Sequence, residues 1–215
     1  MRKKYEKQLE NLKNDVFKLG EMCGRAVEDS ILSLKSQNVE LAKEVIKNDD
    51  VIDDLYRNLE ERCLEIIALQ QPVAHDLRIL ITTVKVLTDL ERIGDYANNI
   101  AEITVKLKDS PYFKPLINNA NMAELGKKML KMSMHIYMEE RDENADEVFE
   151  LDNEVDSTYH QLFRELTSYM MEDPKTITQA SQFMLVARHL ERIADHALNI
   201  ANRVIYMVRA DIEYI

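Results

Sequence analysis

The chain has 215 residues, with 39 acidic side chains against 28 basic ones and a formal net charge of −11. This length is enough for one domain or two small ones with a buried core. An acidic chain lacks the concentrated basic surface that nucleic-acid binding requires. The four glycines and four prolines are too few for the turns of a β-sandwich or a doubly wound α/β fold. The composition therefore predicts an all-α protein that does not bind nucleic acid.

The cysteines and the hydropathy pattern indicate where the protein works. Cys23 and Cys63 are too few for a disulfide scaffold and lack a metal-binding spacing, so we expect buried thiols in a reducing compartment. The N-terminal residues are charged and contain no apolar signal segment. The longest uncharged run, 176–187, has twelve residues, too few to cross a bilayer. We predict a soluble, cytoplasmic protein.

The scarce prolines divide the chain into predicted helices. Pro72 and Pro174 should each start a helix, because proline is tolerated at the first helical position. Pro111 and Pro115 mark a linker. Weaker breaks lie at 36–38 and 141–144, where asparagine and aspartate can cap a following helix. The expected helices, which carry apolar residues at helical spacing, are 5–36, 39–70, 72–108, 118–141, 144–172 and 175–211.

The chain contains an internal duplication. Residues 90–102 (LERIGDYANNIAE) and 190–202 (LERIADHALNIAN) agree at nine of thirteen positions. Residues 42–59 and 145–162 agree at seven of eighteen, at nearly the same offset. Two such blocks indicate tandem repeats. We predict two units of three helices each, at 1–110 and 111–215, since about a hundred residues suit an up-down-up bundle.

Each repeat carries the pattern acid-x-x-x-Asp twice, on its second and third helices. Residues four apart share a helix face. Within each repeat, the two pairs lie at similar numbers of residues from the turn between their antiparallel helices. Because each helical residue rises by 1.5 Å, the four acids of a repeat should lie at the same height along the helix axes. An asparagine follows each third-helix pair. The predicted metal ligands are Asp49, Asp53, Glu91, Asp95 and Asn99 in the first repeat, and Asp152, Asp156, Glu191, Asp195 and Asn199 in the second.

Oxygen ligands of this kind suit a hard cation such as Mg²⁺, Mn²⁺, Ca²⁺ or iron, and the absence of cysteine from the acidic motifs disfavours structural zinc. The alternative is a solvated helix surface whose acids pair with Arg92, Arg192 or lysines, as is usual for one isolated pair. The acid pair recurs four times at matched heights, which favours a metal site over a solvated surface. Elsewhere, Gly20 and Gly24 should allow a neighbouring helix to approach closely. The chain has no phosphate-binding glycine loop and no nucleophile with a positioned base, so we predict no enzymatic activity.

The duplicated blocks, the Asp-x-x-x-Asp partners and the segment QPVAHDLR at 71–78 resemble the PhoU family of phosphate-transport regulators over essentially the whole chain. One departure is that the second repeat lacks Asp-Leu-Arg after Pro174. The resemblance implies two three-helix bundles related by pseudo-twofold symmetry, with the acidic motifs binding iron or other divalent or trivalent metal ions. It also implies a cytoplasmic, non-enzymatic homodimer that is a negative regulator of phosphate uptake and phosphate-starvation signalling. The implied partners are a phosphate-sensing histidine kinase and the ATPase subunit of a phosphate ABC transporter, so the protein would associate with a membrane only through its partners.

A second class of function is a metal-carboxylate helical bundle in metal storage, metal homeostasis or redox chemistry. Histidine ligands and a buried, inward-facing site would favour that class. The five histidines form no Glu-x-x-His pair, and the acids flank the apolar stripes instead of lying within them. These features favour the regulator.

Overall fold

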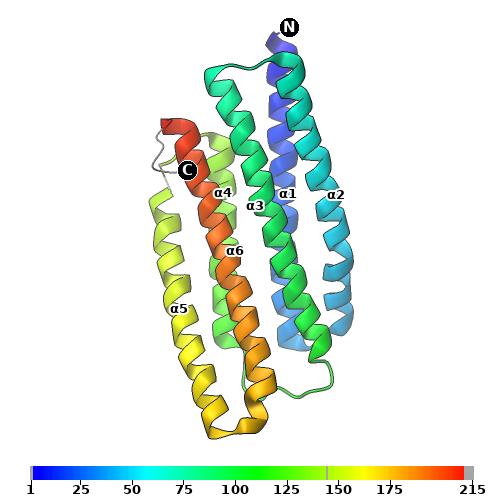
Figure 1. Ribbon diagram of the computed structural model, residues 1–215, viewed down its shortest axis with the longest axis vertical. Helices are drawn as coiled ribbons and strands as arrows, with labels where there is room; N and C mark the ends of the chain where they lie inside the picture. Colours follow the sequence, from blue (N-terminus) through cyan, green and yellow to red (C-terminus); the bar gives the residue numbers. More distant parts are fainter. Residues whose placement is uncertain (1, 144, 211–215) are drawn as a thin grey trace.

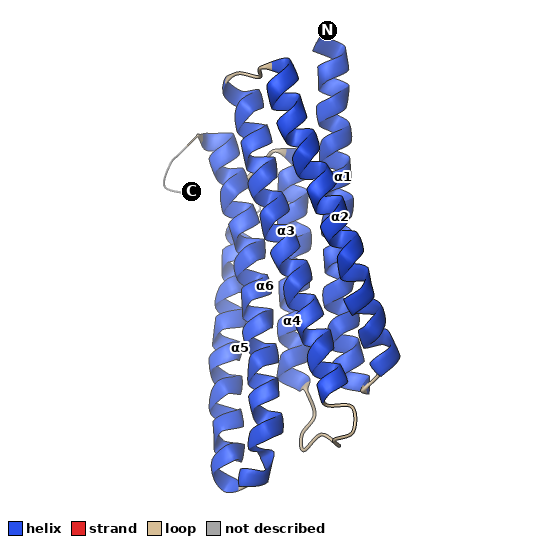
Figure 2. Ribbon diagram, turned by 45° about the vertical axis from the view of Figure 1, so that its right-hand side comes forward, coloured by secondary structure: helices blue, strands red, loops and turns tan. Residues whose placement is uncertain are grey.

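The computed structural model describes residues 2–143 and 145–210, and within these ranges it contains helices and no strands (Figure 2). The all-α prediction is therefore confirmed. The predicted boundaries at 144 and 211 lie outside the described residues. The helices are α1 (Arg2–Ser36), α2 (Val39–Gln70), α3 (Ala74–Lys106), α4 (Ile117–Glu139), α5 (Ala145–Glu172) and α6 (Ile177–Arg209), with a short 3₁₀ helix, η1 (Pro174–Thr176), before α6.

The turns follow the predicted breaks, with two corrections. Asn38 caps α2, as expected, by accepting a hydrogen bond from the backbone N–H of Leu41 at 3.1 Å. Pro72, however, does not start α3. Gln71 ends α2 in the left-handed conformation and Val73 is extended. The turn therefore continues past the proline, and α3 begins two residues after it, at Ala74. Pro174 likewise starts η1 instead of α6.

The two repeats lie side by side and point in opposite directions. In Figure 1, α5, α6, α3 and α2 form a front layer, with α4 and α1 behind. The repeats meet where α3 lies against α6 and where α1 lies against α4. The α2–α3 and α5–α6 turns are at opposite ends of the molecule (Figure 1), as pseudo-twofold symmetry requires. This arrangement places the helix pairs that carry the acidic motifs on either side of the central α3–α6 contact.

Within the described residues, the main apolar core runs through both repeats. The predicted stripes of α3 and α6 are buried in it. Between the repeats, the buried hydroxyl of Tyr137 lies 2.8 Å from Thr83 Oγ1, so both polar groups are satisfied. Gly20 permits close approach, as predicted, because a Cβ there would lie 2.9 Å from Met134 Cγ. Gly24 does not, since a Cβ would meet only Leu130 Cδ2 at 3.9 Å.

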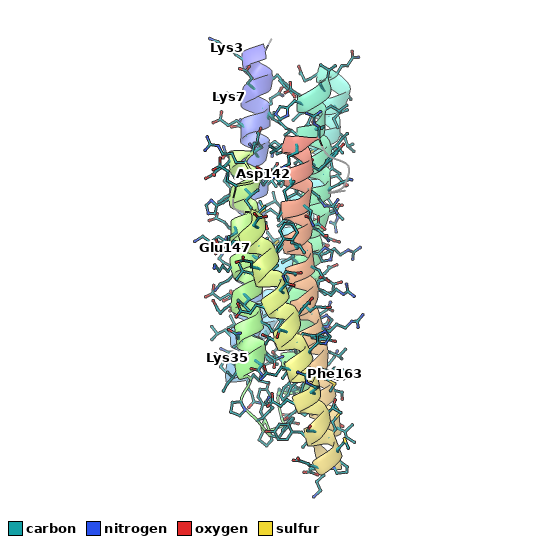
Figure 3. All side chains as sticks on the ribbon, turned by 90° about the vertical axis from the view of Figure 1, so that its left-hand side faces the viewer. Lys3, Lys7, Lys35, Asp142, Glu147 and Phe163 are labelled. Atoms are coloured by element: carbon teal, nitrogen blue, oxygen red, sulfur yellow. The ribbon has the colours of Figure 1, made fainter. Side chains whose placement is uncertain are left out.

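Charged side chains are spread along the outer surface. Figure 3 shows Lys3, Lys7 and Lys35 along α1, and Asp142 and Glu147 where α4 leads into α5. Phe163 on α5 is 48% exposed, but isolated apolar side chains are normal on a protein surface. None of the described helices contains an apolar stretch long enough to span a membrane.

Candidate metal centres

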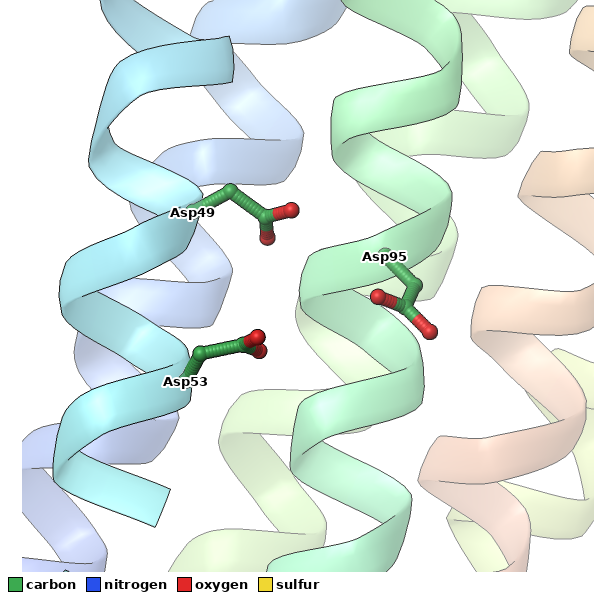
Figure 4. Close-up of side chains that lie close together, drawn as sticks. All are labelled: Asp49, Asp53 and Asp95. Atoms are coloured by element: carbon green, nitrogen blue, oxygen red, sulfur yellow. The ribbon is translucent and has the colours of Figure 1, made fainter. Parts of the chain in front are cut away.

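The first acidic cluster lies between α2 and α3. Asp49 and Asp53 extend from α2 towards Asp95 on α3 (Figure 4). One carboxylate oxygen from each of these residues lies within 4.8 Å of the other two. Glu91, one turn before Asp95, adds a fourth carboxylate whose charge interacts with the other three. The structure thus brings together the four acids that the sequence placed at one height in the first repeat.

Close packing of α2 on α3 brings these acids together. Gly94 faces α2, and a Cβ at this position would lie 3.2 Å from Ile52 Cγ2 and 3.5 Å from Asp49 Oδ1. A contact of 3.2 Å is tighter than most side chains accept, so the absence of a side chain lets α2 approach. Glycine inside a helix costs stability, and here it gives Asp49 a position against α3.

Asn98 is a residue of this cluster that the sequence analysis missed. Its Nδ2 donates a hydrogen bond to Asp49 Oδ2 at 2.6 Å, while its Oδ1 is buried and has no hydrogen-bond partner. The sequence contained a signal for this residue, because Asn98 lies three residues after Asp95 and therefore on the same helix face. In the described part of the chain, the predicted Asn99 forms no hydrogen bond with the acids. Asn199 in the second repeat is exposed.

The first cluster has more negative charge than its cationic neighbours balance. Burial raises the pKa values of Asp49 and Glu91, and the charge of Asp95 raises both further. Two arginines pair with the cluster: Arg57 donates to Asp53 at 3.1 Å and Arg92 donates to Asp95 at 3.0 Å. Both arginine side chains are mostly exposed, so solvent weakens their effect. Asp49 forms no ion pair among the described residues.

The second cluster repeats this arrangement between α5 and α6 with fewer cationic partners. Burial, followed by the charges of its three acidic neighbours, raises the pKa of Asp152 to about 6. Burial also raises the pKa of Glu191. Arg192 is the cationic partner here, and it donates to Asp195 at 2.9 Å. Asp156 is exposed, and within the described ranges no three carboxylate oxygens of this repeat lie as close as those of the first.

The donor set fits a hard cation. Each cluster offers four carboxylates from two helices, and the first adds the buried, unpartnered amide oxygen of Asn98. Oxygen donors of this type suit Mg²⁺, Mn²⁺, Ca²⁺ or iron. Arg92 and Arg192 do pair with acids, as the solvated-surface alternative expected. Among the described residues, however, Asp49 and Asp152 have no cationic partner, although burial makes their charges the most costly within the two clusters.

Comparison with known proteins gives the family. The model of the PhoU domain matches the chain twice, at residues 16–104 and 120–204. The chain belongs to the PhoU family. Each match falls on three successive helices that carry one acidic cluster, so the duplicated sequence blocks correspond to two copies of the PhoU domain.

Individual members of the PhoU family match along almost their whole length. A phosphate-specific transport system accessory protein PhoU homolog from Aquifex aeolicus is 44% identical over 206 residues, which cover 96% of this chain and 93% of that protein. A PhoU homolog from Clostridium acetobutylicum is 38% identical and covers 96% and 95%, respectively. The crystal structure of PhoU from Pseudomonas aeruginosa superposes with a TM-score of 0.92 at 34% identity, covering 96% of this chain and all of that one.

Proposed function

We propose that this protein is an accessory regulator of a phosphate-specific transport system, and that it lowers phosphate uptake and phosphate-starvation signalling when phosphate is plentiful. Membership of the PhoU family and the names of its Aquifex and Clostridium relatives support the transport role. In this proposal the protein is a cytoplasmic homodimer without enzymatic activity. It acts as an adaptor between the ATPase subunit of the transporter and the phosphate-sensing histidine kinase.

The observation that carries the metal-binding part of this proposal is the charge of the two clusters. Each repeat gathers four carboxylates, and the half-buried Asp49 and Asp152 have no cationic partner among the described residues. A bound divalent or trivalent cation, such as iron, Mn²⁺, Mg²⁺ or Ca²⁺, would supply the missing positive charge. Because the ligands come from two helices, they would hold α2 against α3 and α5 against α6 in one register. The resulting rigid face is the surface we propose for partner docking.

Elemental analysis of protein purified without chelator tests the metal sites. The key variant replaces Asp53, Glu91, Asp156 and Glu191 with alanine. A matched control replaces Asp50 and Asp54, two exposed acids on α2. We expect stoichiometric metal in the parent and the control and none in the key variant. Equal metal in all three proteins would contradict the assignment.

Binding of the three proteins to the purified ATPase subunit and to the cytoplasmic part of the histidine kinase tests the adaptor role. Surface plasmon resonance should show binding by the parent and the control, and weaker binding by the variant without acidic ligands. If neither partner bound the metal-loaded parent, the adaptor role would be wrong. Unchanged binding by the metal-free variant would show that docking is independent of metal.

A further inference from the structure

Among the positions at which the two acidic clusters differ, one supplies an amide next to the carboxylates in the first repeat alone. When the repeats are aligned on their LERI segments, Asn98 of the first corresponds to Leu198 of the second. Leu198 is partly buried and packs against the core. The polar contact between Asn98 and Asp49 therefore has no counterpart in the second repeat. The two clusters, although duplicated, present different sets of oxygen atoms.

In the first repeat, Asn98 affects Asp49 in two ways. Its hydrogen bond at 2.6 Å restrains one carboxylate oxygen of Asp49, and such support from a neighbouring residue orients a metal ligand before the ion arrives. Its buried Oδ1 has no hydrogen-bond partner, and a native protein seldom leaves a buried polar atom unpaired without a reason. Rotation of the amide when an ion binds would exchange the hydrogen bond for a bond from this oxygen to the cation, and hard cations accept such an oxygen as a ligand.

In the second repeat the corresponding carboxylate lacks this support. Asp152 forms no hydrogen bond with residue 198, since leucine has no polar atom. Its partner Asp156 is exposed, and the carboxylate oxygens of this repeat are not gathered as closely as those of Asp49, Asp53 and Asp95. A cation entering the second cluster must draw its ligands together, which reduces its affinity.

We propose that Asn98 makes the first cluster the tighter of two unequal cation sites, by holding Asp49 in place before the ion arrives and by then turning its own side-chain oxygen to the ion as a further ligand. The inference rests on the metal-binding function proposed above. It predicts that the first repeat fills at lower metal concentration and that the second responds only when the concentration rises.

Titration of the full-length, chelator-stripped protein with Mn²⁺ tests this proposal, with unbound Mn²⁺ measured by electron paramagnetic resonance. Substituting Asp156 and Glu191 with alanine isolates the first site, and substituting Asp53 and Glu91 isolates the second. We expect the first site to have a Kd at least about tenfold lower than the second, the scale on which supporting residues act at metal sites. Equal Kd values would overturn the proposal while leaving the metal-binding function intact.

Reciprocal substitutions assign the difference to this position. In the first-site protein, Asn98→Leu should raise the Kd by about 10- to 100-fold. In the second-site protein, Leu198→Asn should lower it, whereas Leu198→Ala, which removes apolar packing without adding an oxygen, should not. Because the two substitutions lie in different repeats, misfolding of one leaves the other informative. An unchanged Kd in both exchanged proteins would refute the role of Asn98.

Asn98→Asp separates the two contributions of the side chain. Aspartate keeps an oxygen at this position but has no N–H group to donate to Asp49. If the oxygen is a ligand, this variant should bind Mn²⁺ at least as tightly as the parent first site. A Kd raised as far as in Asn98→Leu would show that Asn98 acts only as a donor, and the ligand assignment would be wrong. Absence of Mn²⁺ binding at both isolated sites would refute this inference together with the metal-binding function.

Discussion

Asp89 and two acids of the first cluster, Glu91 and Asp95, lie close together along α3, yet their surroundings differ. Asp89 lies in the α3–α6 contact and is 2% exposed. Its two carboxylate oxygens face α6, where Arg203 Nε donates at 2.6 Å and His196 Nδ1 lies at 2.9 Å. Glu91, only two residues later in the chain, turns away from this contact and joins a cluster with too few cations.

The difference separates a carboxylate that the chain itself pairs from carboxylates that it leaves with too few cations. A buried charge is tolerated only when it is paired and hydrogen-bonded, and Asp89 receives both partners from the other repeat. The cluster acids are at most partly buried, and their arginines are partly or mostly exposed, so a cation from solution can compete for them. An acid whose partner the chain itself supplies joins the two repeats, and an acid without such a partner is available to a metal ion.

The contact around Asp89 also shows how duplicated positions have diverged. Asp89 corresponds to His189 in the second repeat, and Tyr96 corresponds to His196. Near the pseudo-twofold axis, the ring of Tyr96 lies 5.6 Å from that of His189 and 5.8 Å from that of His196. One side of the contact is thus an ion pair and the other an aromatic contact. Two identical repeats would have made the same contact on both sides.

The largest loss of stability should follow from the removal of Asp89, the acid that is paired within the chain. Asp89→Ala leaves Arg203 in the contact without its carboxylate, and loss of one partner of a buried pair costs roughly 3–5 kcal/mol. Urea denaturation followed by circular dichroism measures this loss. Asp54→Ala, which breaks an exposed pair with Arg57, should cost less than about 1 kcal/mol. Similar losses in both variants would show that the α3–α6 ion pair contributes no more than a surface one.

The clusters should respond to metal, which the contact around Asp89 does not need. A cation present at about a hundred times its Kd stabilises the folded state by about 2.7 kcal/mol per site. Addition of Mn²⁺ should therefore raise the melting temperature of the parent, and a chelator should reverse the increase. The variant lacking Asp53, Glu91, Asp156 and Glu191 should show neither change. A shift of the same size in that variant would place the metal elsewhere.

A smaller effect concerns pH. Because the pKa of Asp152 is raised to about 6 in the folded chain, its favourable contribution to stability is complete at low pH and is lost as pH rises through about 6. In metal-free protein, Asp152→Asn should therefore raise the melting temperature at pH 7, and this gain should shrink towards zero below about pH 4. Thermal melts between pH 4 and 7 measure the difference. Glu154→Gln, at an exposed position on α5, is the control, and a pH-independent gain in Asp152→Asn would contradict the assigned cause.

The smallest effect should come from the other contact between the repeats, where α1 packs against α4. Gly24→Ala should stabilise the protein by about 0.5–1 kcal/mol, because alanine favours the helix and the added methyl group meets only ordinary contacts. Gly20→Ala should gain less, since its methyl group displaces the side chain of Met134. Thermal denaturation of the two variants measures the difference. A larger gain at Gly20 than at Gly24 would contradict the packing described here.

Much of the local structure could be predicted from the sequence. The ends of α1, α2 and α5 at Ser36, Gln70 and Glu172 match the prediction, because proline, capping residues and apolar spacing act over a few neighbouring residues. The common height of Asp49, Asp53 and Asp95 followed from the constant rise of a helix on both sides of one turn. The start of α3 was wrong by two residues, since the conformations of Gln71 and Val73 depend on how the two helices pack.

The sequence by itself determined the six helices, their duplication and the two acid-rich levels, all of which depend on spacing along the chain. Only the tertiary structure decided which polar residues meet. Asp89 contacts His196 and Arg203, which lie 107 and 114 positions later in the chain. Asn98, not Asn99, contacts Asp49. The physical reason is that the height of a residue is set by its own helix, whereas the direction of its side chain is set by the rotation of that helix against its neighbours. This rotation is fixed by packing across the whole core.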